Sequence, residues 1–188
     1  MKKYILPSLA LAVVAILGTW PMLPQADFYV QKSLSTQSGY VSSKLDVPDS
    51  YSDSTYETPN TLYIPSILVE TPIIEGVNEK VSLAKGAWRR PNTSTPDKVG
   101  NTVLTGHRFL YTGFSKNTFY NLDKVEKGEK IIVNWSGDIY EYIVEEIKVI
   151  EPTQVGIEGD YGDTRLTLYT CHPLWTAKKR LVLVAKPV

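Results

Sequence analysis

The feature that most constrains the fold is a series of short runs of β-branched and aromatic residues that starts at Thr61. Turn residues separate these runs, and this pattern is typical of an all-β domain. The runs predict eight strands, which are Leu62–Ile64, Ile67–Glu70, Thr71–Ile74, Thr102–Thr105, Lys130–Trp135, Ile139–Ile150, Leu166–Cys171 and Arg180–Val184. About eight strands form a barrel or a sandwich, so residues 61–188 are expected to be one β domain.

Two details of the pattern set the local geometry. Ser136-Gly137-Asp138 lies between two strand runs and predicts a short hairpin turn. In Ile139–Ile150 the apolar positions change from even to odd numbers after the pair Glu145-Glu146, which predicts a β-bulge. The segments Glu79–Gly86 and Ser115–Leu122 are typical of single helical turns that connect strands.

The N-terminal part of the chain has a different composition. Tyr4–Leu23 carries no charged side chain and, as a helix, is long enough to cross a bilayer. Two lysines precede it, so residues 1–3 are expected in the cytoplasm and everything after the span outside. A cleaved signal peptide is the alternative, but the run is longer than a usual signal core and no clear Ala-x-Ala site follows. Residues 24–60 are rich in Ser and Thr and predict a flexible extracytoplasmic stalk.

Composition excludes several classes of function. Basic and acidic residues both number 20, so the formal charge is zero and no nucleic-acid partner is expected. With one cysteine, Cys171, and two histidines, an internal disulfide is excluded and a Cys/His zinc site is disfavoured. Glu158, Asp160 and Asp163 suit solvated turn residues as well as a calcium site, so they do not predict a metal site. We therefore expect no metal and no other cofactor.

The single thiol ends a predicted strand. Side chains alternate along it, so Cys171 shares the less apolar face with Thr167 and Tyr169. Eight residues separate Cys171 from Arg180, and a hairpin would bring the two to adjacent strand ends. A guanidinium beside a thiol favours the thiolate and donates hydrogen bonds to an oxyanion. A free cysteine is also often a small buried hydrophobe, and spacing alone leaves both interpretations open.

A thiolate nucleophile requires a proton acceptor that later protonates the leaving amine, and histidine suits both tasks. His172 follows Cys171 directly, so in an extended chain the two side chains point to opposite faces. His107 follows an apolar run and Gly106, which places it at a strand end, where loops carry functional groups on a rigid scaffold. We therefore predict that His107 is the partner of the thiol.

Three separated motifs resemble those of the sortase family. Thr167-Leu168-Tyr169-Thr170-Cys171 is similar to the family's Thr-Leu-x-Thr-Cys strand end, and Arg180 follows nine residues later. Thr105-Gly106-His107-Arg108 resembles the family's histidine element, and Ile64-Pro65-Ser66-Ile67 its first strand pair. The likeness runs from about Thr61 to Val188.

The resemblance implies a closed eight-stranded β-barrel and a transpeptidase that cleaves an LPxTG-like sorting signal between Thr and Gly. Cys171 would attack the Thr carbonyl, Arg180 would stabilise the oxyanion, and His107 would protonate the leaving amine. The thioester would pass to an amine of a cell-wall precursor or of a pilin lysine. Thr170 and Trp175 are the candidate substrate-binding residues, although Trp175 would equally suit a cover over the barrel mouth.

The subclass and two alternatives stay open. Asp46–Tyr51 lacks the Asp-Pro-aromatic lid motif of pilin-polymerising members, which favours a class D or E type, and the short Cys-to-Arg interval resembles classes C and E. An L,D-transpeptidase also uses Cys and His, but its cysteine lies close after a His-Gly element that is missing here. The other alternative is a membrane-tethered binding module in which Cys171 is buried and His107 is incidental. Reactivity of the folded protein toward a methanethiosulfonate separates these hypotheses.

Overall fold

The computed structural model describes residues 28–30, 32–33, 60–109 and 117–188. The chain divides into two compact units, Met1–Lys44 and Leu45–Val188. Residues 28–30 and 32–33 of the first unit are helical. The predicted cytoplasmic segment 1–3, the predicted transmembrane segment Tyr4–Leu23 and nearly all of the predicted stalk lie outside the described residues. Within the part of the chain that is described, no helix has both the length and the apolar character needed to span a bilayer.

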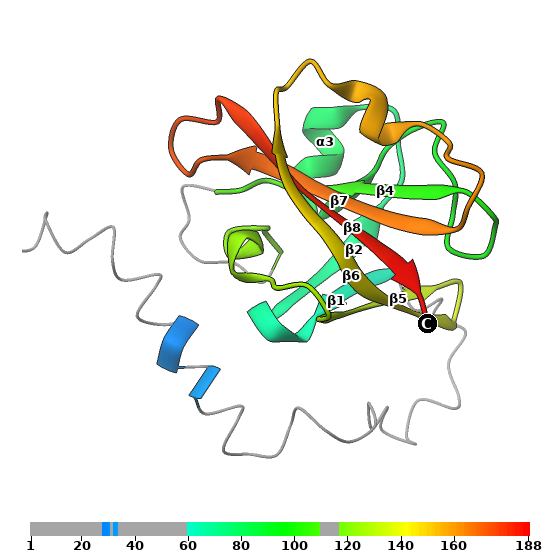
Figure 1. The fold of residues 1–188 in the computed structure, drawn as a ribbon, viewed down its shortest axis with the longest axis horizontal. Helices are drawn as coiled ribbons and strands as arrows, with labels where there is room; N and C mark the ends of the chain where they lie inside the picture. The colour runs from blue at the N-terminus through cyan, green and yellow to red at the C-terminus, as the bar shows by residue number, and fades with distance from the viewer. Residues whose placement is uncertain (1–27, 31, 34–59, 110–116) are drawn as a thin grey trace, which may run out of the picture. The chain divides into compact units, whose positions relative to one another are not determined.

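Eight strands of the second unit close into a barrel (Figure 1). They are β1 (Thr61–Ile64), β2 (Val69–Ile74), β3 (Ala87–Arg89), β4 (Asn101–Thr105), β5 (Lys130–Trp135), β6 (Asp138–Ile150), β7 (Arg165–His172) and β8 (Lys179–Pro187). Their order around the barrel is β1-β2-β3-β4-β7-β8-β6-β5, and the β1–β5 pair closes it. The β2–β3 and β4–β7 pairs are parallel and the others antiparallel. The prediction of a closed, eight-stranded all-β domain is confirmed.

Aliphatic side chains from most of the strands fill the barrel. Those without solvent exposure include Leu62, Ile64, Val103, Leu104, Ile131, Val133, Leu166, Leu168 and Leu183. Burial of one such side chain contributes about 1.5–3 kcal/mol to folding. β4 is buried at all five positions and pairs with β3 on one side and β7 on the other. The strands that lead to the motif residues are therefore central to the core.

Two of the predicted strand assignments are wrong. Ile67–Glu70 and Thr71–Ile74 form one strand, β2, instead of two, because Pro65 begins the 3₁₀ helix η3 (Pro65–Ile67) and Leu68 has a left-handed φ of 56°. The chain reverses there, and regular pairing with β1 resumes at Val69. β3 was not predicted, because a strand of three residues is too short to show an alternating pattern.

The predicted hairpin and bulge are confirmed. Ser136 and Gly137 have φ values of 53° and 91°, and this turn joins β5 to β6. The register between β6 and β8 shifts between Val144 and Glu146, so Glu145 is the extra residue of the bulge. The bulge bends the longest strand of the barrel at the point where the apolar pattern changes face.

Of the two predicted helical turns, one is confirmed and one is misplaced. The helix α3 (Glu79–Leu83) begins at Asn78, whose Oδ1 accepts a hydrogen bond from the Val81 amide at 3.1 Å. In place of a turn over Ser115–Leu122, the 3₁₀ helix η4 covers Leu122–Lys124, and residues 110–116 are not described. An unpredicted 3₁₀ helix, η5 (Val155–Glu158), lies in the connection between β6 and β7.

Candidate active site

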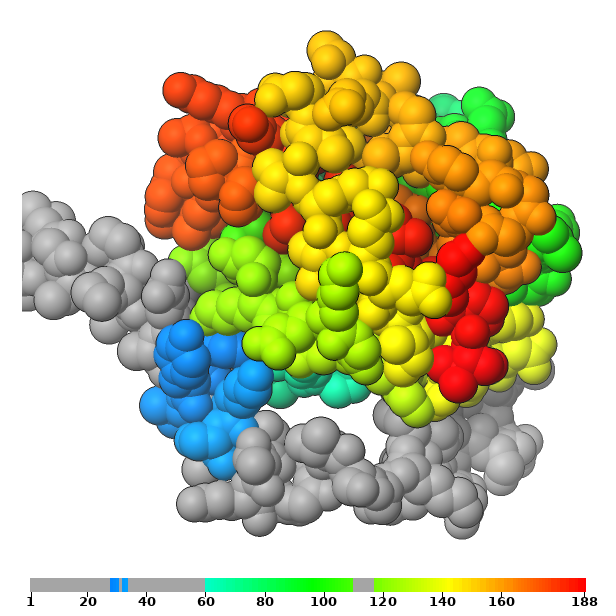
Figure 2. Space-filling view, in the orientation of Figure 1, coloured from blue at the N-terminus to red at the C-terminus, as the bar shows by residue number. Residues whose placement is uncertain are grey.

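The β7–β8 hairpin brings Cys171 and Arg180 together. The two residues are direct cross-strand partners in the antiparallel pair, and side chains in such positions share a face with Cβ atoms about 5 Å apart. β7 extends one residue further than predicted, to His172, which pairs with Lys179. The loop that joins the two strands lies at the surface (orange-red in Figure 2), and residues 175–179 are exposed. The hairpin inferred from the eight-residue spacing is therefore confirmed.

His107 reaches the same region from β4. β4 is parallel to β7 with Thr105 opposite Tyr169, so the chain after Thr105 continues alongside the end of β7. The Gly106 amide donates to the Tyr169 carbonyl at 3.4 Å, and the Phe119 amide donates to the His107 carbonyl at 2.9 Å. A Cβ on Gly106 would lie 3.0 Å from the Phe119 ring, so a larger residue here would have to displace the ring by a few tenths of an ångström.

One pocket of about 250 Å³ is lined by all three predicted catalytic residues, Cys171, His107 and Arg180. Its other walls come from α3 and from the start of the β6–β7 connection, with Leu83 and Ile150 among the lining residues. Cys171 and His107 are both partly exposed, so they are accessible from the pocket. The binding-module hypothesis requires a buried cysteine, and this cysteine is not buried. His172 is not one of the described residues that line this pocket.

The guanidinium of Arg180 is held by its own hairpin. Its Nη1 donates to the carbonyls of Ala177 at 3.2 Å and Lys179 at 3.0 Å. These contacts help to fix the side chain, which lines the pocket. The fork of an arginine carries five N–H donors, so this arrangement leaves donors for a ligand beside the thiol.

The two predicted substrate-binding residues occupy different positions. Thr170 lines the pocket, but its buried hydroxyl donates to the Gly106 carbonyl at 2.8 Å and so joins β7 to the turn before His107. Trp175 is 63% exposed and packs edge-on against Phe109, with 4.5 Å between the ring centroids. It is not among the described residues that line the pocket. A contact of either residue with substrate stays a prediction.

Glu158, one of the three acidic residues whose role the sequence leaves open, is not a solvated turn residue. Its Oε1 accepts hydrogen bonds from Arg90 Nε at 2.9 Å and from the Tyr169 hydroxyl at 2.7 Å, and all three residues line the pocket. Burial raises the pKa of Tyr169, and its hydrogen bond to Glu158 raises it further. Burial alone would lower the pKa of Arg90, but the hydrogen bond to Glu158 and neighbouring negative charges raise it overall. In the sequence, only the position of Tyr169 on the same strand face as Cys171 indicated this group of three residues.

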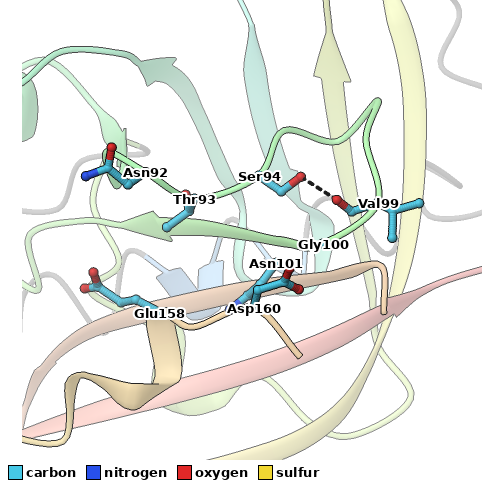
Figure 3. A pocket seen from close by; sticks show the side chains of 8 residues that line it. All are labelled: Asn92, Thr93, Ser94, Val99, Gly100, Asn101, Glu158 and Asp160. Atoms are coloured by element: carbon cyan, nitrogen blue, oxygen red, sulfur yellow. Dashed lines mark hydrogen bonds between the residues drawn. The ribbon is translucent and has the colours of Figure 1, made fainter. Parts of the chain in front are cut away.

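A second pocket of about 110 Å³ lies on the other side of Glu158, and Figure 3 shows the residues that line it. Glu158 and Asp160 lie across from the β3–β4 connection, where Ser94 and Val99 are hydrogen-bonded (Figure 3). Asn101, which also lines this second pocket, is almost fully buried. Within the described residues, no three His, Cys, Asp or Glu side chains gather as metal ligands do. Asp163, the third residue of the acidic set, forms ion pairs with Arg165 and Lys186.

Comparison with known proteins places this geometry in a family. A family model described as the sortase domain matches residues 62–188. Sortase A of Listeria monocytogenes is 32% identical over 126 residues, which are 67% of this chain and 54% of that protein. Sortase D of Bacillus subtilis is 28% identical over 143 residues, which are 74% of this chain and 68% of that protein. The chain thus spans about half the length of the Listeria relative.

Solved structures agree with the sequence matches. Sortase C2 of the group B Streptococcus pilus island 1 has a TM-score of 0.63 at 31% identity, over 72% of this chain and 76% of that chain. The sortase D5 transpeptidase of Clostridium perfringens has a TM-score of 0.60 at 28% identity, over 69% of this chain and 78% of that chain. The family model covers well over half of the chain, and its range coincides with the barrel that carries Cys171, His107 and Arg180. The chain belongs to the sortase family.

Proposed function

We propose that this protein is a cysteine transpeptidase that cleaves an LPxTG-like sorting signal between Thr and Gly and transfers the acyl part to an amine. The observation that supports the proposal is the convergence of Cys171, His107 and Arg180 on one pocket, although His107 and Cys171 come from different strands. Family membership supports the transpeptidase class, and the choice of peptide motif is the finer part of the proposal.

The proposed reaction has two halves. The Cys171 thiolate attacks the Thr carbonyl carbon, and the oxyanion that forms accepts hydrogen bonds from the Arg180 guanidinium. Collapse of this intermediate breaks the Thr–Gly bond, His107 gives its proton to the departing Gly amine, and a thioester to Cys171 remains. An incoming amine then attacks the thioester, loses a proton to His107, and releases the thiolate. Atoms and protons balance without a cofactor.

The proposed partners follow from this chemistry. The acyl donor is a protein with an LPxTG-like signal, and the acceptor is an amine of a cell-wall precursor or a pilin lysine. One solved relative is described as a pilus-related sortase C of group B Streptococcus, which supports a pilin lysine, and the family match supports an amine acceptor in general. Leu83, Ile150 and Val155 are apolar residues in a lining that is otherwise largely polar, and they suit contact with the Leu-Pro part of such a signal.

The experiment that tests the proposal is intact-protein mass spectrometry of the full chain with a Leu-Pro-x-Thr-Gly peptide. We expect a thioacyl adduct that disappears when an amine is added. Cys171→Ala forms no adduct, and His107→Ala forms it about 10²–10⁴-fold more slowly. Arg180→Lys loses the planar fork and slows acylation about 10²–10³-fold.

His172→Ala is the matched control, because strand alternation points this histidine away from the thiol. Its acylation rate is expected to stay within about threefold of that of the unaltered protein. Cleavage by Cys171→Ala would overturn the proposal. Normal acylation by His107→Ala together with slow acylation by His172→Ala would reverse the assignment of the base.

We also propose that Tyr4–Leu23 anchors the protein in the cell membrane with the barrel outside. The support is the charge-free length of this segment and the two lysines before it. Protease added to intact cells should release the barrel, and mass analysis of the membrane fraction should find the segment. A mature chain that begins near Gln25 would show a cleaved signal peptide instead.

A further inference from the structure

Three of the polar side chains that line the active-site pocket, and that the proposed reaction does not use, meet at one point. Arg90 follows β3, Glu158 ends η5, and Tyr169 lies in β7 two residues before Cys171. The three residues therefore come from separate parts of the barrel and meet at one carboxylate oxygen, Oε1 of Glu158. We name this set the Glu158 cluster.

Both hydrogen bonds of the Glu158 cluster are of the stronger kind. Each involves at least one charged group, and their lengths are 2.9 Å from Arg90 Nε and 2.7 Å from the Tyr169 hydroxyl. The Glu158 side chain is 21% exposed, so water does little to satisfy the carboxylate. The pKa of Tyr169 is raised above its ordinary value of 10.0, so its hydroxyl stays protonated, and therefore a donor, in the neutral range and into the alkaline range. The Glu158 carboxylate therefore links Arg90, which follows β3, to Tyr169 in β7.

Arg90 is itself held in place by its neighbours. Its guanidinium lies 4.4 Å from the centroid of the Trp88 ring, a cation–π contact. The buried Trp88 in turn donates from Nε1 to the Gly76 carbonyl at 2.8 Å, in the segment before α3. A chain of contacts therefore runs from the segment before α3, through Trp88 and Arg90, to Glu158.

A second residue holds the same part of the β6–β7 connection. Asn101 Nδ2 donates to the carbonyls of Ile157 at 2.9 Å and Gly159 at 3.0 Å, so the backbone is held on both sides of Glu158. Asn101 Oδ1 accepts from the Thr167 hydroxyl at 2.8 Å, which ties this contact to β7 as well. In the earlier part of the connection, Val155 is exposed. The end of η5, which forms one wall of the pocket, is thus held in place by side-chain hydrogen bonds.

We propose that Arg90, Glu158 and Tyr169 are positioning residues that fix the β6–β7 connection against the strand of Cys171, and that this fixed wall sets the affinity for the peptide substrate. Tyr169 and Cys171 lie on the same face of β7, so the hydroxyl of Tyr169 sets how far the wall stands from the thiol. None of the three residues takes part in bond making. The substrate part of this inference rests on the proposed function, whereas the contact between wall and strand can be tested without substrate.

The test compares Tyr169→Phe with Tyr161→Phe in the full chain. Tyr169→Phe removes the hydroxyl that joins β7 to Glu158 and keeps the ring. Tyr161→Phe removes a hydroxyl from the same connection, but that hydroxyl donates only to Gly156 within the connection, and Tyr161 does not line the pocket. We expect Tyr169→Phe to raise KM for a Leu-Pro-x-Thr-Gly peptide about five- to tenfold with kcat within about twofold, because ground-state positioning is lost. Tyr161→Phe should leave both constants unchanged.

Variants at Glu158 distinguish a positioning role from a general loss of protein stability. Glu158→Gln keeps a carbonyl acceptor, so its increase in KM should be smaller than that of Glu158→Ala. In a double variant, Tyr169→Phe should add little to Glu158→Ala, because both remove the same contact. Additive increases in KM would overturn the inference.

Hydrogen exchange tests the contact without substrate. Amides of residues 157–159 should exchange about tenfold faster in Tyr169→Phe than in Tyr161→Phe. Unchanged exchange, or faster exchange with an unchanged KM, would overturn the positioning role. If the unaltered protein forms no acyl-enzyme, the proposed function fails, and the exchange comparison still decides whether the Glu158 cluster fixes the connection.

Discussion

Thr170 makes a buried side-chain contact that joins the two halves of the candidate active site. Its hydroxyl donates to the Gly106 carbonyl at 2.8 Å, and the side chain is 1% exposed. Gly106 precedes His107, and Thr170 precedes Cys171. One buried hydrogen bond therefore connects the turn of the proposed base to the strand end of the proposed nucleophile.

Thr170→Val keeps the shape of the side chain and removes this donor. The Gly106 carbonyl then loses its hydrogen bond in a buried place, so the free energy of unfolding should fall by about 1–3 kcal/mol. Urea unfolding measures this change, and the exposed Thr153→Val serves as the control with a change below about 0.5 kcal/mol. Equal stability of the two variants would show that the hydrogen bond contributes nothing net.

At the residue scale, the sequence predicts contacts within one hairpin better than contacts across the barrel. The pairing of Cys171 with Arg180 follows from a short spacing between two strands, which fixes the register. Arg90 and Glu158 are 68 positions apart and meet only because the barrel closes, so no local pattern indicates their ion pair. The residues expected to react could be proposed from motifs, whereas those that support them could not.

At the scale of elements, the turn between β5 and β6 shows how a positive φ favours glycine. Gly137 has a φ of 91°, and a Cβ added there would meet no atom within 4 Å, so only conformational strain opposes a side chain. Gly137→Ala should lower the free energy of unfolding by about 1–2 kcal/mol, measured by thermal or urea denaturation. Gly156→Ala is the control, because that glycine has equal space and no positive φ. A cost as large at Gly156 would attribute the loss to something other than the turn.

Elements with a strong local signal were predicted, and elements set by tertiary contacts were not. The bulge at Glu145 was visible because the apolar pattern changes face within one long strand. β3 has three residues and owes its strand geometry to β2 and β4 on either side. The two runs assigned as separate strands between Ile67 and Ile74 look alike in composition, and only the reversal at Leu68 shows where the strand begins.

For the whole molecule, ionisation of the buried Tyr142 makes the free energy of unfolding depend on pH in the alkaline range. Burial, followed by the influence of Tyr140, raises the pKa of Tyr142 from 10.0 to about 12. Since the unfolded chain loses this proton first, the contribution of Tyr142 to stability is complete below pH about 10 and is lost as the pH rises through about 12. The loss should be about 2–3 kcal/mol.

Tyr142→Phe removes this titration and leaves the ring in the core. Between pH 9 and 12, the free energy of unfolding of the unaltered protein should fall by about 2–3 kcal/mol more than that of the variant. Urea unfolding at a series of pH values gives both curves, and their difference excludes titrations that the two proteins share. Parallel curves would mean that the hydroxyl ionises equally well in the folded state.

The order of strands around the barrel lies beyond what the local patterns predict. They indicate an all-β domain, but the parallel pairing of β4 with β7 joins strands 64 positions apart, from Asn101 to Arg165. Family resemblance supplied the closed barrel in advance. The motif at His107 begins at the last residue of β4, and the motif at Cys171 lies in β7. The local residue patterns therefore predicted the all-β class, and the family resemblance predicted the closure of the barrel.

The barrel should fold without the residues that precede Asn60. Asn60 is the first residue with contacts to the barrel among those described in this unit: its carbonyl accepts from the Ile73 amide at 2.7 Å, and its Oδ1 accepts from the Ser136 amide at 2.7 Å. A chain that starts at Asn60 keeps both bonds and should show one cooperative thermal transition. A chain that starts at Thr61 loses both and should be about 1–2 kcal/mol less stable. Calorimetry of the two chains measures the difference, and a shorter chain as stable as the longer one would show that Asn60 does not anchor β1.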